Sequence, residues 1–269
     1  MSINCVNVDG LREVSETLLV TLYMRSLETK RKNGIICDRK SVEIVDRINY
    51  DFSAHYSEVS QAIIAIRTKV IDELVEKFIG ICPNATVINL GAGLCTRFSR
   101  LDNGKVNWIN IDLANVQPVW NSLIGESPRS QYLSHSILDF TWINKVKAAK
   151  PTQALFVAEG VLMFLTESEV RQLIDKIQAN FPRSEMIFDS LGLFLAKNSN
   201  LNSGSLGVEA SYKWGIEDLR EIEAWNEQVK LLHCYYYLDR YKNRLGWLGL
   251  LSYLPMMRRQ VKVGHFRFD

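Results

Sequence analysis

The chain changes character at Ala85-Thr86-Val87-Ile88-Asn89-Leu90-Gly91-Ala92-Gly93, where a short apolar run stops abruptly at a glycine loop. The run is rich in β-branched residues, which pack well on a pleated surface, and it therefore predicts a buried strand. Glycines directly after a first strand let the chain turn sharply and let a ligand approach the backbone, where any Cβ would clash. By itself the loop fits an ordinary strand-to-helix turn about as well as it fits a ligand site.

Further apolar runs follow this strand at intervals that leave room for helices, as at Val161–Phe181. The runs are Val106–Ile111, Gln131–Ile137, Gln153–Ala158, Glu185–Ser190, Val229–Leu238 and Gln260–Phe268. The last two of these six runs predict an antiparallel hairpin that closes the sheet. Alternation of buried strands and helices predicts an α/β fold. We expect a Rossmann-like sheet of seven strands, parallel except for one antiparallel strand, with helices on both faces.

The residues before the first strand have a helical pattern, because apolar side chains recur at steps of three and four between Leu11 and about Glu76. We therefore expect an N-terminal helical cap over residues 1–80, which contributes to the substrate pocket, and a ligand-binding core over 81–269. Asn198–Gly207 is rich in asparagine, serine and glycine and predicts a mobile loop. It lies within a predicted lid insertion at about 195–215.

The overall composition excludes several classes of protein. The 269 residues are 47% hydrophobic and 23% charged, which is typical of a single globular domain, and the formal net charge is only +2. The net charge of the chain is therefore too small to favour binding to nucleic acid or to an anionic membrane by electrostatic attraction. The five cysteines have no pairwise metal or redox spacing, so we expect reduced thiols in a cytoplasmic protein without a metal. The most apolar late stretch, 245–257, is too short to cross a bilayer, and we expect no signal peptide.

Acidic residues end three successive predicted strands. Asp112 follows the second strand, Asp139 the third and Glu159 the fourth. Asp112 stands about twenty residues after the glycines, where a carboxylate can accept hydrogen bonds from both ribose hydroxyls; its alternative role is to cap a helix starting at Leu113. Asp139 alone fits a helix cap or a surface charge better than a ligand contact, and the repetition of carboxylates at three strand ends is what favours the ligand role. Since Leu94-Cys95-Thr96 replaces the third glycine of a dinucleotide fingerprint, the pattern favours a nucleoside ligand without a pyrophosphate.

Several motifs together resemble the leucine carboxyl methyltransferase family, including its branch of polyketide-synthesis, tetracenomycin-type O-methyltransferases. The resemblance spans about Leu11 to Asp189. The motifs are Thr17-Leu18-Leu19, Tyr23, Arg25, Tyr50-Asp51-Phe52, Arg67, Asn89 to Arg97, Asp112, Leu138-Asp139 with Trp142, and Glu159 to Leu165. The resemblance implies a class I methyltransferase fold with S-adenosyl-L-methionine as the methyl donor and S-adenosyl-L-homocysteine as the product.

The resemblance also implies which residues hold the donor. Arg67 would pair with the methionine carboxylate, and Glu159 would lie close to the same amino acid end. The glycines would pass under the methionine portion, Asp112 would hold the ribose, and Asp139 with Phe140 would frame the adenine. The implied cofactor-binding set is Arg67, Gly91, Ala92, Gly93, Asp112, Leu113, Asp139, Phe140 and Glu159. Cys95 departs from the family pattern, in which aspartate is more typical.

The methyl acceptor is implied only as a class. We expect an oxygen atom of a small-molecule or peptide natural product, either a hydroxyl or a carboxylate. A carboxylate arrives ionised and needs no base, whereas a phenol or alcohol needs one, for which His55 is the candidate among the four histidines. Tyr23 and Arg25 are the candidate acceptor contacts, although core packing for Tyr23 and a helix surface for Arg25 fit equally well.

Three other functions remain open at this point. The acceptor could be the carboxylate at the C-terminus of a protein. A nucleotide-dependent dehydrogenase could use a similar sheet, and a degenerate methyltransferase fold could bind its ligand without catalysis. A nucleic-acid substrate is disfavoured, because the basic runs Lys30-Arg31-Lys32 and Arg258-Arg259 are short.

Overall fold

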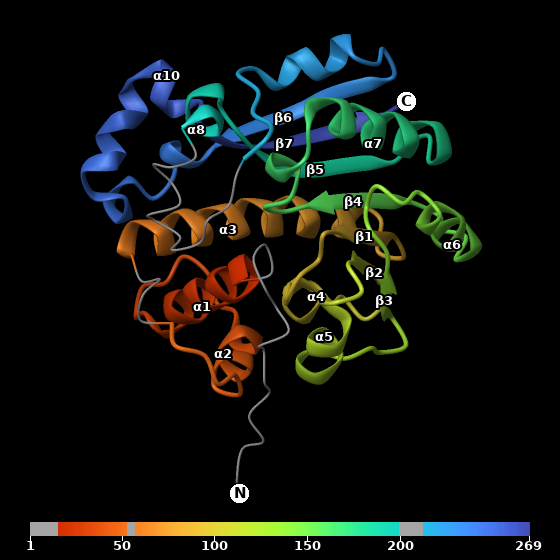
Figure 1. Cartoon of the computed structure of the whole chain (residues 1–269), viewed down its shortest axis with the longest axis horizontal. Coiled ribbons are helices and arrows are strands. Elements are labelled where there is room, and N and C mark those ends of the chain that lie inside the picture. The colour runs from red at the N-terminus through yellow and green to blue at the C-terminus, as the bar shows by residue number, and fades with distance from the viewer. Residues whose placement is uncertain (1–15, 53–56, 199–211) are drawn as a thin grey trace, which may run out of the picture.

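The structure is a computed structural model that describes residues 16–52, 57–198 and 212–269 (Figure 1). Seven strands form one sheet: β1 (Thr86–Leu90), β2 (Asn107–Asp112), β3 (Ser130–Ser134), β4 (Ala154–Ala158), β5 (Glu185–Leu191), β6 (Val229–Tyr236) and β7 (Val261–Phe268). Their order across the sheet is β3-β2-β1-β4-β5-β7-β6. β7 runs antiparallel to both neighbours, whereas the other neighbouring strands run parallel. The predicted sheet with one antiparallel strand is confirmed.

The glycine loop lies where the strand order reverses. From β1 the chain moves outward to β2 and β3, and it then crosses to β4 on the other side of β1. The loops that leave β1 and β4 therefore run to opposite sides, which opens the crevice where sheets of this kind bind ligands. Every residue of β1 and β4 is buried, so these two strands are a rigid support for whatever lies at their carboxyl ends.

Helices cover both faces of the sheet. α6 (Trp142–Ala148) and α7 (Glu167–Asn180) contribute to the apolar cluster on one face. α3 (Glu58–Ile81) and α4 (Arg97–Leu101) contribute to the cluster on the opposite face. Because α3 packs along the sheet, this last helix of the predicted cap also completes the core. The division of the chain at residue 80 stays a prediction.

The helical pattern predicted over 161–181 corresponds to two helices. A 3-10 helix, η3 (Leu162–Phe164), comes first, and Leu165 then adopts extended backbone. The side chain of Thr166 accepts the backbone N–H of Glu169, and the Glu169 carboxylate accepts the backbone N–H of Thr166. This reciprocal capping box begins α7 as a separate helix.

The N-terminal helices pack directly on the glycine loop. α1 (Glu16–Lys30), α2 (Arg39–Val45) and α5 (Gln117–Leu123) share a third apolar cluster with Leu94. A Cβ added at Gly93 would lie 2.5 Å from Cδ2 of Leu18. Figure 1 shows α1 and α2 together beside the first half of α3. The cap therefore fixes the outer side of the loop.

The later part of the chain contains mostly short helices. They are α8 (Leu193–Lys197), η4 (Leu219–Ala224), η5 (Tyr237–Asp239), η6 (Lys242–Arg244), η7 (Gly246–Tyr253) and α10 (Pro255–Arg258). The candidate base His55 and most of the predicted lid lie outside the described residues. Among the helices of the described ranges, none is both long and apolar enough to span a bilayer.

Candidate active site

The glycine loop is held open by backbone conformations that favour glycine. Gly91 and Gly93 have φ angles of 60° and 49°, in the left-handed region where a Cβ is strained. A Cβ at Gly91 would also lie 2.5 Å from a methyl carbon of Val161. Ala92 ties the loop to the sheet, because its N–H donates to the carbonyl of Ile111 over 3.1 Å. The loop therefore exposes backbone without side chains at the point where the strand order of the sheet reverses.

Asp112 joins the loop to the end of β2. Its Oδ2 accepts the N–H of Gly93 over 2.6 Å, and its Oδ1 accepts the N–H of Leu113 over 2.7 Å. The alternative role as a helix cap is wrong, because α5 begins only at Gln117 and its N-cap residue is Val116. Burial raises the pKa of Asp112, and the two backbone hydrogen bonds, which act to lower this pKa, offset only part of that effect. Each carboxylate oxygen retains a lone pair for a further donor such as a ribose hydroxyl.

Leu113 lies beside this carboxylate and is 47% exposed. The Tyr132 hydroxyl donates to the Leu113 carbonyl over 3.1 Å and holds that backbone in place. An exposed leucine next to a half-buried carboxylate offers an apolar surface for a ring and acceptors for hydroxyls. This pairing fits the adenosine part of a nucleoside ligand.

Asp139 has a local structural role in the described residues. Its Oδ1 accepts the N–H and the hydroxyl of Thr141 over 3.2 and 2.9 Å, and its Oδ2 lies 3.2 Å from Nδ1 of His135. The hydrogen bond from His135 lowers the pKa of Asp139. Phe140 packs against the apolar cluster of α6 and α7, with the Lys176 ammonium 5.9 Å from its ring centroid. Framing of an adenine by Asp139 and Phe140 stays a prediction.

Glu159 and Arg67 are brought into direct contact. Oε1 of Glu159 accepts Nε–H of Arg67 over 2.9 Å and the hydroxyl of Thr68 over 3.2 Å. Oε2 accepts a second guanidinium, from Arg97. Burial alone raises the pKa of Glu159, but the charges of Arg97 and Arg67 hold it well below its usual range. The side chain therefore stays ionised although only 11% of it is exposed.

Arg67 keeps donors available for a ligand. Its Nε pairs with Glu159, and its Nη1 lies 3.5 Å from Oδ2 of Asp189. Its Nη2 has no hydrogen-bond partner among the described residues. The Arg67 side chain is 14% exposed, so a carboxylate at the crevice can reach the remaining N–H groups.

The Arg67–Glu159 pair belongs to a larger buried group of alternating charges, which we call the arginine–carboxylate network. Four guanidinium groups from helices α1, α3 and α4 alternate with four carboxylates. Its members are Arg25, Asp38, Arg100, Asp72, Arg97, Glu159, Arg67 and Asp189. Each charge in such a network is compensated, and removal of one would leave the opposite charges around it with less compensation in a buried setting.

The two predicted acceptor contacts are both packed inside the cap. Arg25 is 6% exposed; its Nε donates to Asp38 over 3.1 Å and its Nη2 to the Leu94 carbonyl over 3.0 Å. The Tyr23 ring stacks on Phe52 with centroids 4.4 Å apart. Arg25 is therefore not the surface residue of the alternative interpretation but supports the glycine loop. Acceptor contacts by Tyr23 and Arg25 stay predictions.

Cys95 lies beside Arg97. Its Sγ accepts an N–H of Arg97 over 3.5 Å, next to the Arg97–Glu159 contact. Cys95 is one of four described cysteines with free thiols; the others are Cys37, Cys82 and Cys234. The thiol thus lies at the edge of the arginine–carboxylate network.

The sequence prediction missed the residues on the far side of Arg67. Asp189 on β5 is 3% exposed, and its Oδ1 accepts the N–H of Gly160 over 2.6 Å. Burial raises the pKa of Asp189, and the positive charge of Arg67, which acts to lower this pKa, offsets only part of that effect. The Tyr237 hydroxyl is buried beside this carboxylate, and burial together with the charge of Asp189 raises the pKa of Tyr237. The acidic residue at the end of a fifth strand was the available signal, since it continues the series that begins at Asp112.

The family of the chain follows from comparison with known proteins. The family model described as leucine carboxyl methyltransferase matches residues 18–178. The tetracenomycin polyketide synthesis O-methyltransferase TcmP of Streptomyces glaucescens is 28% identical over 267 residues, covering 96% of this chain and 98% of the relative. The S-adenosyl-L-methionine-dependent methyltransferase dpfgK of Gibberella zeae is 29% identical over 268 residues, covering 89% and 88%.

A solved structure from Thermobifida fusca, assigned as a methyltransferase, shares the fold with a TM-score of 0.62 at 15% identity, and the match covers 97% of both chains. The arrangement of glycine loop, strand-end carboxylate and arginine is thus found on a methyltransferase sheet and within a chain-long match to methyltransferases. The protein is an S-adenosylmethionine-dependent methyltransferase and belongs to the leucine carboxyl methyltransferase family.

Proposed function

We propose that the protein transfers the methyl group of S-adenosylmethionine to an oxygen atom, a hydroxyl or a carboxylate, of a small-molecule or peptide natural product. The observation that carries the proposal is the convergence of three features at one crevice: the bare glycine loop, the carboxylate of Asp112 and the available Nη2 of Arg67. The chain-long match to an enzyme named as a polyketide O-methyltransferase supports the acceptor class. The free thiols among the described residues support a cytoplasmic location.

Each residue has a distinct role towards the donor. Asp112 accepts the ribose hydroxyls, and Leu113 packs against the base. Arg67 donates to the methionine carboxylate through Nη2, while Glu159, ionised between two arginines, attracts the ammonium group. The bound donor supplies a methyl group activated by a positive sulfur. What the protein adds is a fixed alignment, and holding two reactants in line can itself supply much of the rate acceleration.

A hydroxyl acceptor also has to lose a proton. Asp189 is the buried carboxylate at the end of β5 whose pKa is raised by burial, and it is therefore a better proton acceptor than an exposed aspartate. We propose Asp189 as the general base for a hydroxyl acceptor. A carboxylate acceptor would leave Asp189 with a positioning role through Arg67 and Gly160.

The donor assignment is tested by calorimetry with S-adenosylhomocysteine and with a nicotinamide dinucleotide. We expect binding of the first and none of the second, because the loop lacks the third glycine of a pyrophosphate site. Dinucleotide binding without S-adenosylhomocysteine binding would overturn the proposal in favour of a dehydrogenase.

The acceptor is tested with a radiolabelled donor and a panel of phenolic, carboxylic and peptide compounds. Treating the product with mild base separates the two chemistries, because methyl esters hydrolyse readily and aryl methyl ethers do not. A base-labile label on a protein C-terminus would replace the natural product by a protein acceptor. Failure to label any oxygen acceptor, with labelling at nitrogen or sulfur instead, would overturn the proposed O-methylation.

A further inference from the structure

The segment between β6 and β7 carries an exposed apolar row. In a 3-10 helix the side chains at positions i and i+3 are eclipsed, so three rows run along its length. In η7 one of these rows is formed by Trp247, Leu250 and Tyr253, which are 70%, 67% and 73% exposed. Leu254 and Met256 continue the surface at 53% and 57% exposed. We call these five residues the apolar row.

The other two rows of η7 anchor it to the protein. Leu248 and Leu251 pack against the cluster that includes α3. Gly249 and Ser252 are buried, and the Ser252 hydroxyl donates to the Gly249 carbonyl over 2.8 Å. A Cβ at Gly249 would lie 2.7 Å from the carbonyl oxygen of Lys242. Since both inner rows are fixed, the apolar row is held outward by the fold.

The stretch that carries the apolar row is basic in sequence. Residues 240–259 contain five basic and no acidic residues. Arg240, Arg244 and Arg258 pair with carboxylates from outside this stretch. Lys242 and Arg259 form no ion pair within the described residues, and the Lys242 ammonium lies 4.4 Å from the ring centroid of Tyr253.

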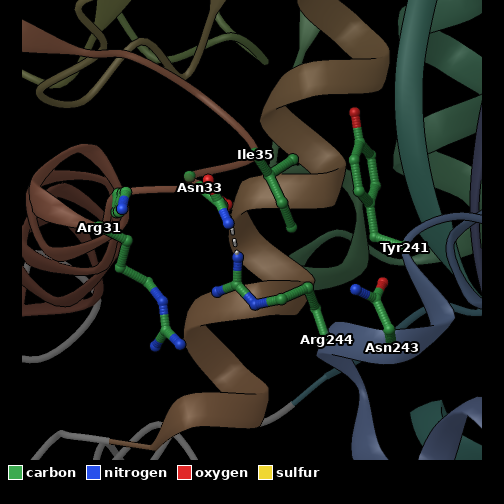
Figure 2. A pocket seen from close by; sticks show the side chains of 8 residues that line it. Arg31, Asn33, Ile35, Tyr241, Asn243 and Arg244 are labelled. Carbon is green, nitrogen blue, oxygen red and sulfur yellow. Dashed lines mark hydrogen bonds between the residues drawn. The ribbon is translucent and has the colours of Figure 1, made fainter.

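A second basic segment, from the cap, lies beside this stretch. Figure 2 shows a pocket lined by the loop after α1 on one side and by residues around η6 on the other. Its lining includes Arg31 and Lys32 with Tyr241, Asn243 and Arg244. The fold thus brings Arg31 and Lys32 next to the basic stretch that carries the apolar row, although some 210 residues separate them in the chain. Lys30 and Arg31 pair with Asp46 and Glu58, so Lys32 is the basic residue of this run that forms no ion pair within the described residues.

We propose that the apolar row and the basic residues around it form a docking surface for an anionic phospholipid membrane. Tryptophan and tyrosine favour the boundary between headgroups and acyl chains, and lysine and arginine attract anionic headgroups. A second copy of this chain is a poorer occupant. A symmetric dimer through this surface would bring two basic surroundings face to face, and like charges at an interface disfavour association.

The position of this surface orients the molecule. At the start of β7, Val261 pairs with Leu191 and Lys262 with Ser190, at the carboxyl end of β5. The apolar row therefore lies on the connection that leaves the same edge of the sheet as Asp189. Docking would turn the active-site edge of the protein towards the bilayer. This binding does not depend on the identity of the acceptor.

Vesicle sedimentation tests the proposal with the full-length protein. We expect binding to phosphatidylcholine vesicles that contain phosphatidylglycerol, much weaker binding to phosphatidylcholine alone, and release at high salt. The double variant Trp247→Ser, Leu250→Ser should bind anionic vesicles roughly tenfold or more weakly, because it removes the inserted apolar surface. The variant Ile81→Ser changes a side chain that is 74% exposed at the end of α3, away from the row, and should bind as the parent does.

A charge variant separates lipid binding from nonspecific stickiness. Lys32→Gln with Lys242→Gln should weaken binding only to anionic vesicles, while the control Lys105→Gln should not. Unchanged S-adenosylhomocysteine affinity would show that the variants fold. The proposal is overturned if anionic vesicles bind no protein, or if the Trp247 and Leu250 substitutions leave binding unchanged. It is also overturned if light scattering shows that these substitutions only convert a dimer to a monomer.

Discussion

Arg67 and Glu159 stand 92 residues apart in the chain, yet Nε of the arginine lies 2.9 Å from Oε1 of the glutamate. The contact joins α3 on one face of the sheet to the end of β4. Because Arg97 holds the other oxygen of Glu159, the pair couples the helix after the glycine loop to the same point. The donor's amino acid end would therefore meet a surface whose charges are already fixed in place before it binds.

Replacing Glu159 tests this preorganisation. Glu159→Gln keeps the shape of the side chain but removes one of the two carboxylates that compensate each of Arg67 and Arg97, so we expect a loss of about 3 to 5 kcal/mol of unfolding free energy. Urea denaturation measures it. The matched control is Glu167→Gln on α7, which breaks an exposed pair with Arg171 and should cost below about 1 kcal/mol. Equal effects of the two substitutions would contradict the compensation described for Glu159.

The same contact predicts a dependence of stability on pH. The folded-state pKa of Glu159 lies below the ordinary value of 4.5, so the unfolded chain binds more protons at acidic pH. The stabilisation by Glu159 is thus fully present above about pH 4.5 and is lost as the pH falls through the folded-state pKa. Denaturation of the parent and of Glu159→Gln between neutral pH and pH 3 should show the two free energies converging at the acid end. Parallel curves would contradict it.

Asp112 should matter for donor binding more than for folding. Asp112→Ala removes the acceptor proposed for the ribose hydroxyls, and charged hydrogen bonds of this kind are worth about 1.5 to 3 kcal/mol, so we expect roughly tenfold to hundredfold weaker S-adenosylhomocysteine binding. Asp112→Asn keeps one acceptor oxygen and should lose less. Calorimetry gives both affinities. Full affinity in Asp112→Ala would remove this residue from the donor site.

Gly93 and Gly104 form a matched pair for the glycine loop. Both have positive φ angles, 49° and 78°, but a Cβ at Gly93 meets Leu18 whereas one at Gly104 meets nothing within 4 Å. Alanine at either position incurs backbone strain of about 1 to 3 kcal/mol. Gly93→Ala should lose more unfolding free energy than Gly104→Ala, as measured by thermal unfolding. The difference between the two losses reports the contact between the cap and the glycine loop. If the two substitutions cost the same, α1 does not press on the loop.

Lys262 predicts a change of stability in alkaline solution. It is 1% exposed, its ammonium donates to the carbonyls of Ile216 and Arg259 over 2.6 and 2.8 Å, and burial lowers its pKa from 10.5 to about 8. The unfolded chain therefore binds more protons between these two values, so stability should rise with pH across that window, by at most about 3 kcal/mol from this residue. The slope should be smaller in Lys262→Met. Identical slopes would mean that Lys262 titrates normally.

Asp189 distinguishes the two acceptor chemistries. With a hydroxyl acceptor, Asp189→Asn should lower kcat at saturating donor by about a hundredfold or more, because general base catalysis contributes roughly that much. The control is Ser190→Ala on the opposite face of β5. A kcat near that of the parent, at every pH tested, would exclude Asp189 as a base and favour a carboxylate acceptor.

Sequence patterns predicted the parts of the fold that depend on local periodicity. Runs of β-branched residues marked the strands, and the glycines marked the switch point, because each signal is contained in a few neighbouring residues. The break before α7 also had a local signal, since Thr166 and Glu169 form a capping box, but the longer helical period over 161–181 concealed it.

The missed features all depend on tertiary contacts. Arg97 looks from the sequence like a surface charge after a loop, and only the fold brings Asp72 and Glu159 to it across 25 and 62 residues. The stretch 245–257 was visible as apolar, but a pattern cannot show that η7 turns with three residues per turn. That geometry decides that Trp247 points outward while Leu248 points inward.

Asp38 has a consequence for protein engineering. This residue of the cap accepts hydrogen bonds from Arg25 on its own side and from Thr96 and Arg100 beside the glycine loop. A chimera that grafts the cap of a relative onto this core, in order to transplant acceptor preference, must therefore carry a carboxylate at position 38 and a guanidinium at position 25. Without them the graft would leave Arg100 with Asp72 as its one counter-charge within the described residues and would loosen the donor crevice it was meant to serve.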